Sequence, residues 1–131
     1  MIPTAALRTI ARARLRDANV LLRGGRGDAA VYLCGYVVEI ALKARICRAL
    51  NWDGFPETAT EFSGLGSLKT HNLALLLRLA GAEERIKRRF GSEWASVLDW
   101  DPEKRYQIVG GISAARARTV VAAATILLRA I

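Results

Sequence analysis

Apolar residues recur every three or four positions between residues 4 and 22, and arginines fill many of the positions between them. This period predicts an amphipathic α-helix with Thr4 as its N-cap and one apolar stripe that faces a core. The glycine-rich run Gly24-Gly25-Arg26-Gly27 should end that helix. A second helix, capped by Asp28, is expected to continue to about Leu50. Because only four residues separate the two helices, they should pack as an antiparallel hairpin.

The middle of the chain predicts a loop and then a short helix. Residues 51–68 contain glycines, a proline and several hydroxyl side chains. A loop of about 18 residues is long for a compact domain, which indicates a segment that is functional or mobile. Thr70 is the expected N-cap of the third helix, and Gly81 lies where a glycine commonly follows the last helical turn.

The remaining pattern predicts helix up to the end of the chain. A helical segment is expected over residues 82–98, interrupted near Gly91-Ser92, with a turn over residues 99–106 and a last helix from its cap Ser113 to Ile131. No segment alternates apolar and polar residues with period two, so no sheet is expected. The fold class is therefore all-α, a single domain over residues 1–131, built as an up-and-down bundle of about four to five helices.

A row of polar side chains interrupts the most apolar of these helices. Tyr32, Tyr36, Glu39 and Lys43 are spaced so that they share one face, while the other faces carry aliphatic residues and cysteine. A helix that is apolar nearly all round is normally buried, so its carboxylate and phenols need partners. Arg105, whose planar guanidinium suits a carboxylate, is the expected partner of Glu39. The row is either a polar seam packed between helices or the edge of a binding site.

Composition excludes several classes of protein. Hydrophobic residues make up 52% of the 131 positions, which argues against disorder. No apolar run reaches the roughly 20 residues that a membrane span needs, and arginines interrupt the N-terminal region, so no signal peptide is expected. With one histidine and no Cys-x-x-Cys, no metal site or cofactor is expected. Cys34 and Cys47 are too far apart on one helix for a disulfide, which favours a cytoplasmic protein with buried, reduced cysteines.

The net charge of +8 is the main indication of a partner. Arg8, Arg12 and Arg16 form one row on the first helix, and their spacing fits either a solvated helix face or a surface that binds nucleic acid. No aromatic residues interleave with the row as stacking platforms would. The charge is therefore compatible with RNA, a nucleotide or an acidic protein as partner.

Several motifs together resemble the HEPN domains of prokaryotes. The segment from Leu21 to Ala44 reads Leu-Leu-x-x-Gly-Arg-x-Asp-Ala-Ala-Val-Tyr-Leu-x-Gly-Tyr-x-x-Glu-x-x-Leu-Lys-Ala, and it is followed by Lys69-Thr70-His71-Asn72-Leu73, by Trp100 and by Arg105-Tyr106. The resemblance covers nearly the whole chain in order and spacing. It implies a small helical bundle that is usually a homodimer. It also implies a role beside a nucleotidyltransferase in a toxin–antitoxin pair, in antiviral defence, or in RNA cleavage or nucleotide binding.

The ribonuclease motif of that family is absent from this chain. HEPN ribonucleases carry an arginine followed, after four to six residues, by a histidine. The only histidine is His71, the positions that would hold the arginine are Gly64, Leu65 and Gly66, and the nearest upstream arginine is Arg48. The usual HEPN cleavage site is therefore missing, which makes an enzyme the less favoured reading.

Three hypotheses follow. The first is a non-catalytic HEPN module that dimerises and binds a partner, and the second is a ribonuclease toxin with a degenerate site around His71, Lys69 and Arg105, in which general acid–base chemistry would act on RNA. The third is a domain that binds a nucleotide or nucleic acid. For His71 the alternative to a catalytic role is a hydrogen bond to the polar row on the neighbouring helix. The candidate binding residues are Tyr32, Tyr36, Glu39, Lys43, Arg105 and Tyr106.

Overall fold

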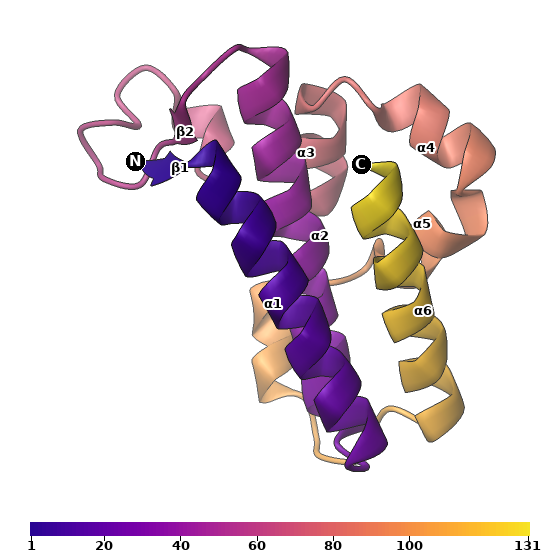
Figure 1. Ribbon diagram of the computed structural model, residues 1–131. Coiled ribbons are helices and arrows are strands. Elements are labelled where there is room, and N and C mark those ends of the chain that lie inside the picture. Colours follow the sequence, from indigo (N-terminus) through magenta and orange to yellow (C-terminus); the bar gives the residue numbers. More distant parts are fainter.

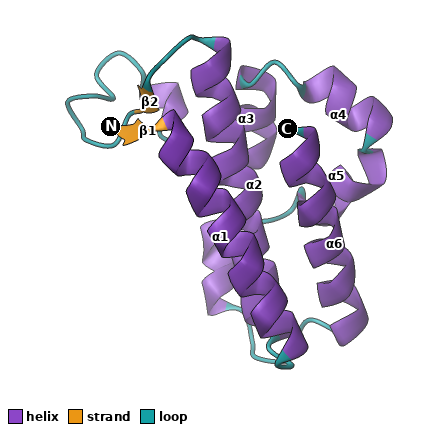
Figure 2. Ribbon diagram, in the orientation of Figure 1, coloured by secondary structure: helices purple, strands orange, loops and turns teal.

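The computed structural model describes all 131 residues, and helices dominate it (Figures 1 and 2). This confirms the all-α class, with six α-helices where about four to five were expected. Two short 3-10 helices, η1 and η2, and one pair of two-residue strands complete the chain. In order the elements are β1 Ile2–Pro3, α1 Thr4–Arg23, α2 Gly27–Ala49, β2 Gly54–Phe55, η1 Gly66–Leu68, α3 Leu73–Leu79, α4 Glu83–Arg89, α5 Gly91–Val97, η2 Pro102–Tyr106 and α6 Ala114–Ala130.

Helix α2 is the centre of the bundle. It runs antiparallel to α1, as the short connection predicts, while α6 lies beside both and α3 packs near its C-terminal half (Figure 1). Eleven of its residues are buried, because neighbours cover it on nearly every side. This burial explains why its sequence is apolar nearly all round.

Three of the four expected helix caps are wrong. Thr4 is the first residue of α1 and its hydroxyl donates to the carbonyl oxygens of Trp52 and Asp53. Asp28 lies inside the first turn of α2, and Thr70 lies before α3, whose N-cap is Asn72. Only Ser113 caps as expected, since its Oγ accepts from the backbone N–H of Arg116. Polar residues near a helix start thus form other contacts when a neighbouring segment offers them.

The expectation of no sheet is also wrong in one small place. Ile2 and Pro3 pair antiparallel with Phe55 and Gly54. A Cβ at Gly54 would lie 2.6 Å from the carbonyl oxygen of Ile2, so only glycine allows the two strands to approach this closely. Phe55 is buried, and the long loop after α2 is therefore tied to the start of the chain.

The segment between α5 and α6 is held against α2 by three contacts. The indole of Trp100 lies over Gly35, and its Nε1 donates to the carbonyl oxygen of Tyr32 at 3.0 Å. Further on, the carboxylate of Asp28 accepts from the backbone N–H of Gly110 at 2.6 Å. Asp28, Tyr32 and Gly35 are spaced to lie on one face of α2. That face fixes where η2 and the following loop sit.

The other expectations for the core are met. Trp94, Trp100 and both cysteines are buried, and 27 buried residues form one continuous core cluster. Burial raises the pKa of the Cys34 thiol to about 12, so this cysteine is an inert part of the core. The break expected near residue 91 falls at Phe90, between α4 and α5. None of the helices combines the length and the apolar character that crossing a membrane requires.

Candidate functional site

A cluster of polar side chains forms around Glu39 in the middle of α2. The Glu39 side chain is only 4% exposed, and both of its oxygens have partners. Lys43, one turn further along α2, places Nζ 2.6 Å from Oε1. His71, from the turn before α3, places Nδ1 2.9 Å from Oε2. The expected hydrogen bond between His71 and the polar row of α2 is therefore present.

The position of His71 leaves one ring nitrogen free to act. His71 precedes the N-cap Asn72, so it lies just outside α3, where the sequence placed it inside the first turn. Because an ionised carboxylate only accepts hydrogen bonds, Nδ1 carries the proton that is donated to Glu39. Nε2 is then left on a side chain that is 55% exposed. A histidine oriented by a buried carboxylate is the arrangement that general bases use.

Two tyrosines extend the cluster along α2. The hydroxyls of Tyr32 and Tyr36 lie 3.3 Å apart, and the Tyr36 ring packs edge-on between the rings of His71 and Trp100. The hydrogen bond to Tyr32, with a further contribution from burial, raises the pKa of Tyr36 to about 12. The Tyr36 phenol therefore stays neutral at physiological pH and serves as a hydrogen-bond donor or acceptor.

Alkaline titration should reveal this hydrogen bond. We expect the last transition of an alkaline titration to come from the Tyr36 phenol, near its pKa of about 12. The raised pKa contributes stability below the ordinary tyrosine value of about 10, and that stability is lost as the pH rises towards the folded value. Tyr32→Phe should bring the last transition back towards 10, as followed by ultraviolet absorbance, whereas Tyr106→Phe should leave it in place. An unchanged last transition in Tyr32→Phe would contradict the assignment.

The expected pair between Arg105 and Glu39 is wrong. Lys43 and His71 already occupy both carboxylate oxygens of Glu39. Arg105 instead donates to the carbonyl oxygen of Pro102, and its guanidinium lies 4.6 Å from the centre of the Tyr106 ring. Both residues are exposed on η2. Arg105 therefore belongs to the surface of the η2 segment.

The remaining candidates make no hydrogen bond or ion pair with Glu39. Lys69 places its ammonium 5.9 Å from the centre of the Phe62 ring. On α1, Arg12 and Arg16 are exposed and Arg8 is half-buried. Burial, together with the charges of Arg48 and Arg12, lowers the pKa of Arg8. Exposure of Arg12 and Arg16 fits a solvated helix face as well as a surface that binds nucleic acid.

The structure adds a groove that the sequence did not indicate. It has a volume of about 670 Å³ and lies at the end of the bundle where α1 turns into α2 and α6 begins. We call it the basic groove, because five cationic side chains and one carboxylate line it. They are Arg23, Arg26, Lys104, Arg105 and Arg118, with Asp28 as the carboxylate.

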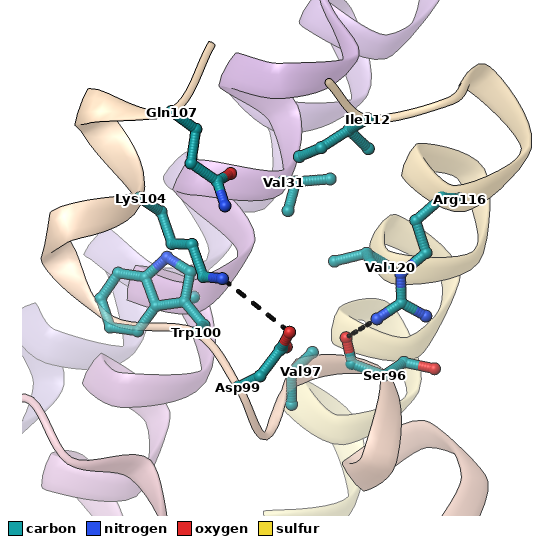
Figure 3. Close-up of a pocket in the computed structure, with 11 residues that line it drawn as sticks. Val31, Ser96, Val97, Asp99, Trp100, Lys104, Gln107, Ile112, Arg116 and Val120 are labelled. Atoms are coloured by element: carbon teal, nitrogen blue, oxygen red, sulfur yellow. Dashed lines mark hydrogen bonds and ion pairs between the residues drawn. The ribbon is translucent and has the colours of Figure 1, made fainter. Parts of the chain in front are cut away.

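A smaller pocket adjoins the basic groove, and we call it the anchor pocket. It has a volume of about 120 Å³ and lies between α2, α5, α6 and η2 (Figure 3). Val31, Val97, Ile112 and Val120 give it apolar walls. Two polar contacts border it: Lys104 Nζ lies 3.9 Å from Asp99, and Arg116 donates to the carbonyl oxygen of Ser96.

The groove was missed because its cations come from three separate segments of the chain. Arg23 and Arg26 are noticeable in the sequence beside the first turn, but nothing in the local pattern places Arg118 next to them. No group of three or more histidine, cysteine, aspartate or glutamate side chains is placed to hold a metal ion. Comparison with protein-family models, with curated proteins and with solved structures finds no match.

Proposed function

We propose that this chain is a HEPN-type helical module that acts by binding other proteins. In this proposal it forms a homodimer in the cytoplasm and engages a nucleotidyltransferase-type partner in a toxin–antitoxin or antiviral defence system. The motifs that resemble HEPN domains support the family, and the missing arginine before His71 argues against the usual RNA cleavage.

One observation carries the binding function. Ile108 and Val109, in the loop after η2, are 86% and 90% exposed, and Tyr106 beside them is 72% exposed. Contiguous apolar side chains that are open to water are a feature of protein interaction sites. The hydrogen bond from Gly110 to Asp28 holds this loop in place, so the side chains are presented in a fixed geometry.

Co-purification with the product of the neighbouring gene tests this proposal. We expect a small nucleotidyltransferase encoded there to co-elute with the wild-type chain, and the double variant Ile108→Asp/Val109→Asp to lose it. Val20→Asp is the matched control, because Val20 is an exposed aliphatic residue on α1. Retention of the partner by the loop variant would contradict the role of this surface.

Light scattering tests the homodimer separately. At micromolar concentration we expect a mass of about twice the 14.3 kDa of one chain. The apolar residues of α2 and α6 are largely buried within one chain. The dimer must therefore use another face, and a monomer would remove this part of the proposal.

The geometry of His71 favours a second candidate, a metal-independent ribonuclease. Glu39 orients His71 and leaves Nε2 exposed, as a general base acting on a 2′-hydroxyl would need. If this is the function, RNA cleavage with chelated metal should be present in the wild type and lost in His71→Ala. Absence of cleavage by the wild type would leave the binding module alone.

A further inference from the structure

Most of the cations that line the basic groove have no partner within the chain. Arg23, Arg26 and Arg118 make no side-chain hydrogen bond and no ion pair, and Lys104 has only the 3.9 Å contact with Asp99. The one carboxylate in the groove, Asp28, is engaged with the backbone of Gly110. The groove therefore offers three arginines, Arg23, Arg26 and Arg118, that no carboxylate of this chain pairs with.

The basic groove also has an apolar part, which adjoins the anchor pocket. Val31, Lys104, Gln107 and Ile112 line both the groove and the anchor pocket, so the two hollows share a wall. Cavities of roughly 150 Å³ with apolar walls can hold a benzene molecule. The anchor pocket, at about 120 Å³, has space for one aliphatic side chain. A ligand that lies in the groove can thus place an apolar group there.

A second copy of this chain is a poor occupant of the groove. In an isologous dimer the same patch meets itself, so the arginines of one groove would face those of the other. Like charges brought together at an interface cost several kcal/mol. The partner must instead bring negative charge.

RNA also fits the groove poorly. Single-stranded nucleic acid binds to basic grooves whose aromatic rings are free to stack with bases. Here Tyr32 is the one aromatic residue that lines the groove, and its ring packs edge-on with Tyr36 at 5.4 Å between ring centres. Beside the groove, the guanidinium of Arg105 lies over one face of the Tyr106 ring. The most exposed side chains of the adjoining loop are the aliphatic Ile108 and Val109. Arginine and tyrosine are enriched in protein–protein interfaces, where exposed apolar side chains become buried.

We propose that the basic groove binds an acidic segment of a partner protein, with one aliphatic side chain of that segment in the anchor pocket. This rests on the proposed function and identifies the chemistry of the partner. Carboxylates of the segment would pair with Arg23, Arg26 and Arg118, and Ile108 and Val109 would cover it from the loop. The aliphatic anchor supplies affinity, and the arginines supply selectivity for acidic sequences and a faster association.

A random library of 12-residue peptides displayed on phage, selected against the full chain, tests this inference. We expect enriched peptides to combine aspartate or glutamate with leucine, isoleucine or valine. The Kd of a labelled enriched peptide should rise at least about tenfold in Arg26→Glu/Arg118→Glu and should also rise with added salt. The matched control is Arg12→Glu/Arg16→Glu, which makes the same charge change at exposed α1 positions that form no side-chain hydrogen bond or ion pair. This control should leave the Kd within about twofold.

Several results would overturn the inference. These are failure to enrich any peptide, enrichment of peptides without acidic residues, and equal loss of binding in the groove and control variants. A 12-nucleotide single-stranded RNA serves as the competing ligand. If it binds more tightly than the peptides and this binding is lost in Arg26→Glu/Arg118→Glu, the groove is a nucleic-acid site. If the neighbouring gene product still co-elutes while no acidic peptide binds, the groove assignment fails and the proposed function stands.

Discussion

Gly35→Ala is expected to destabilise the protein strongly although the substitution adds one methyl group. A Cβ at position 35 would overlap the indole ring of Trp100, which lies directly on the backbone of α2. Trp100 is 6% exposed and donates to the carbonyl oxygen of Tyr32, so a shift of the ring costs buried contacts and this hydrogen bond. Overpacking of this kind costs typically about 1–3 kcal/mol, and the lost hydrogen bond adds about 1 kcal/mol.

The gain in helix propensity from glycine to alanine offsets only about 0.5–1 kcal/mol of that loss. We therefore expect the free energy of unfolding to fall by about 3 kcal/mol and the Tm to fall by on the order of 10 °C. Chemical denaturation followed by circular dichroism measures the first quantity. The displaced Trp100 should also disturb η2 and the groove beside it, so the groove variant tests above should be carried out in the wild-type background.

Gly91→Ala is the matched control for this prediction. Gly91 begins α5, and a Cβ there would meet no atom within 4 Å. The free energy of unfolding of Gly91→Ala should stay within about 0.5 kcal/mol of the wild-type value. The double variant Gly35→Ala/Trp100→Leu is a second check. In the Trp100→Leu background, Gly35→Ala should lower the free energy of unfolding far less, because the indole ring that the added Cβ would overlap is gone. Equal cost in both backgrounds would show that Trp100 is not the cause.

The sequence predicts the helices well because their periodicity is a local property. The apolar stripe of α1 and the apolar residues on nearly all faces of α2 can be recognised without knowing which distant residues pack against them. The caps were harder to predict, because the side chains of Asp28 and Thr70 each form a hydrogen bond that does not cap the expected helix. Asp28 accepts from Gly110, and the Thr70 hydroxyl accepts from the N–H of Asn72. The sequence does not show whether a residue such as Asp28 caps its own helix or holds a distant segment, until the position of that segment is known.

The candidate site also has parts that the sequence predicts and parts that it does not. The row of Tyr32, Tyr36, Glu39 and Lys43 lies on one helix, so its spacing predicted the cluster. The hydrogen bond to His71 could be named only as one alternative to a catalytic role, because nothing in the local pattern fixes which neighbour that side chain meets. The false partner Arg105 was chosen by chemistry alone, without knowledge of where η2 turns. A basic groove assembled from α1, η2 and α6 leaves no local signal at all.

Glu39→Ala is the second change with a large expected effect. It removes the carboxylate from between Lys43 and His71 and leaves the Lys43 ammonium, whose side chain is 17% exposed, without a partner. Loss of one member of a buried ion pair costs roughly 3–5 kcal/mol, because the remaining charge is desolvated and unpaired. We expect a loss near the lower value, since Lys43 retains a contact with the Phe55 ring at 5.1 Å and some access to water.

Glu84→Ala gives a direct comparison, since Glu84 also pairs with a basic residue one turn along its helix. That pair with Arg88 spans 3.8 Å between side chains that are 91% and 65% exposed, so its loss should cost less than about 0.5 kcal/mol. The double variant Glu39→Leu/Lys43→Met separates charge from packing. Replacing both members of a buried pair with apolar residues of similar volume is often neutral, so we expect recovery to within about 1 kcal/mol of the wild type. If the double variant is as unstable as Glu39→Ala, the loss comes from the hydrogen bond to His71 and not from the stranded charge of Lys43.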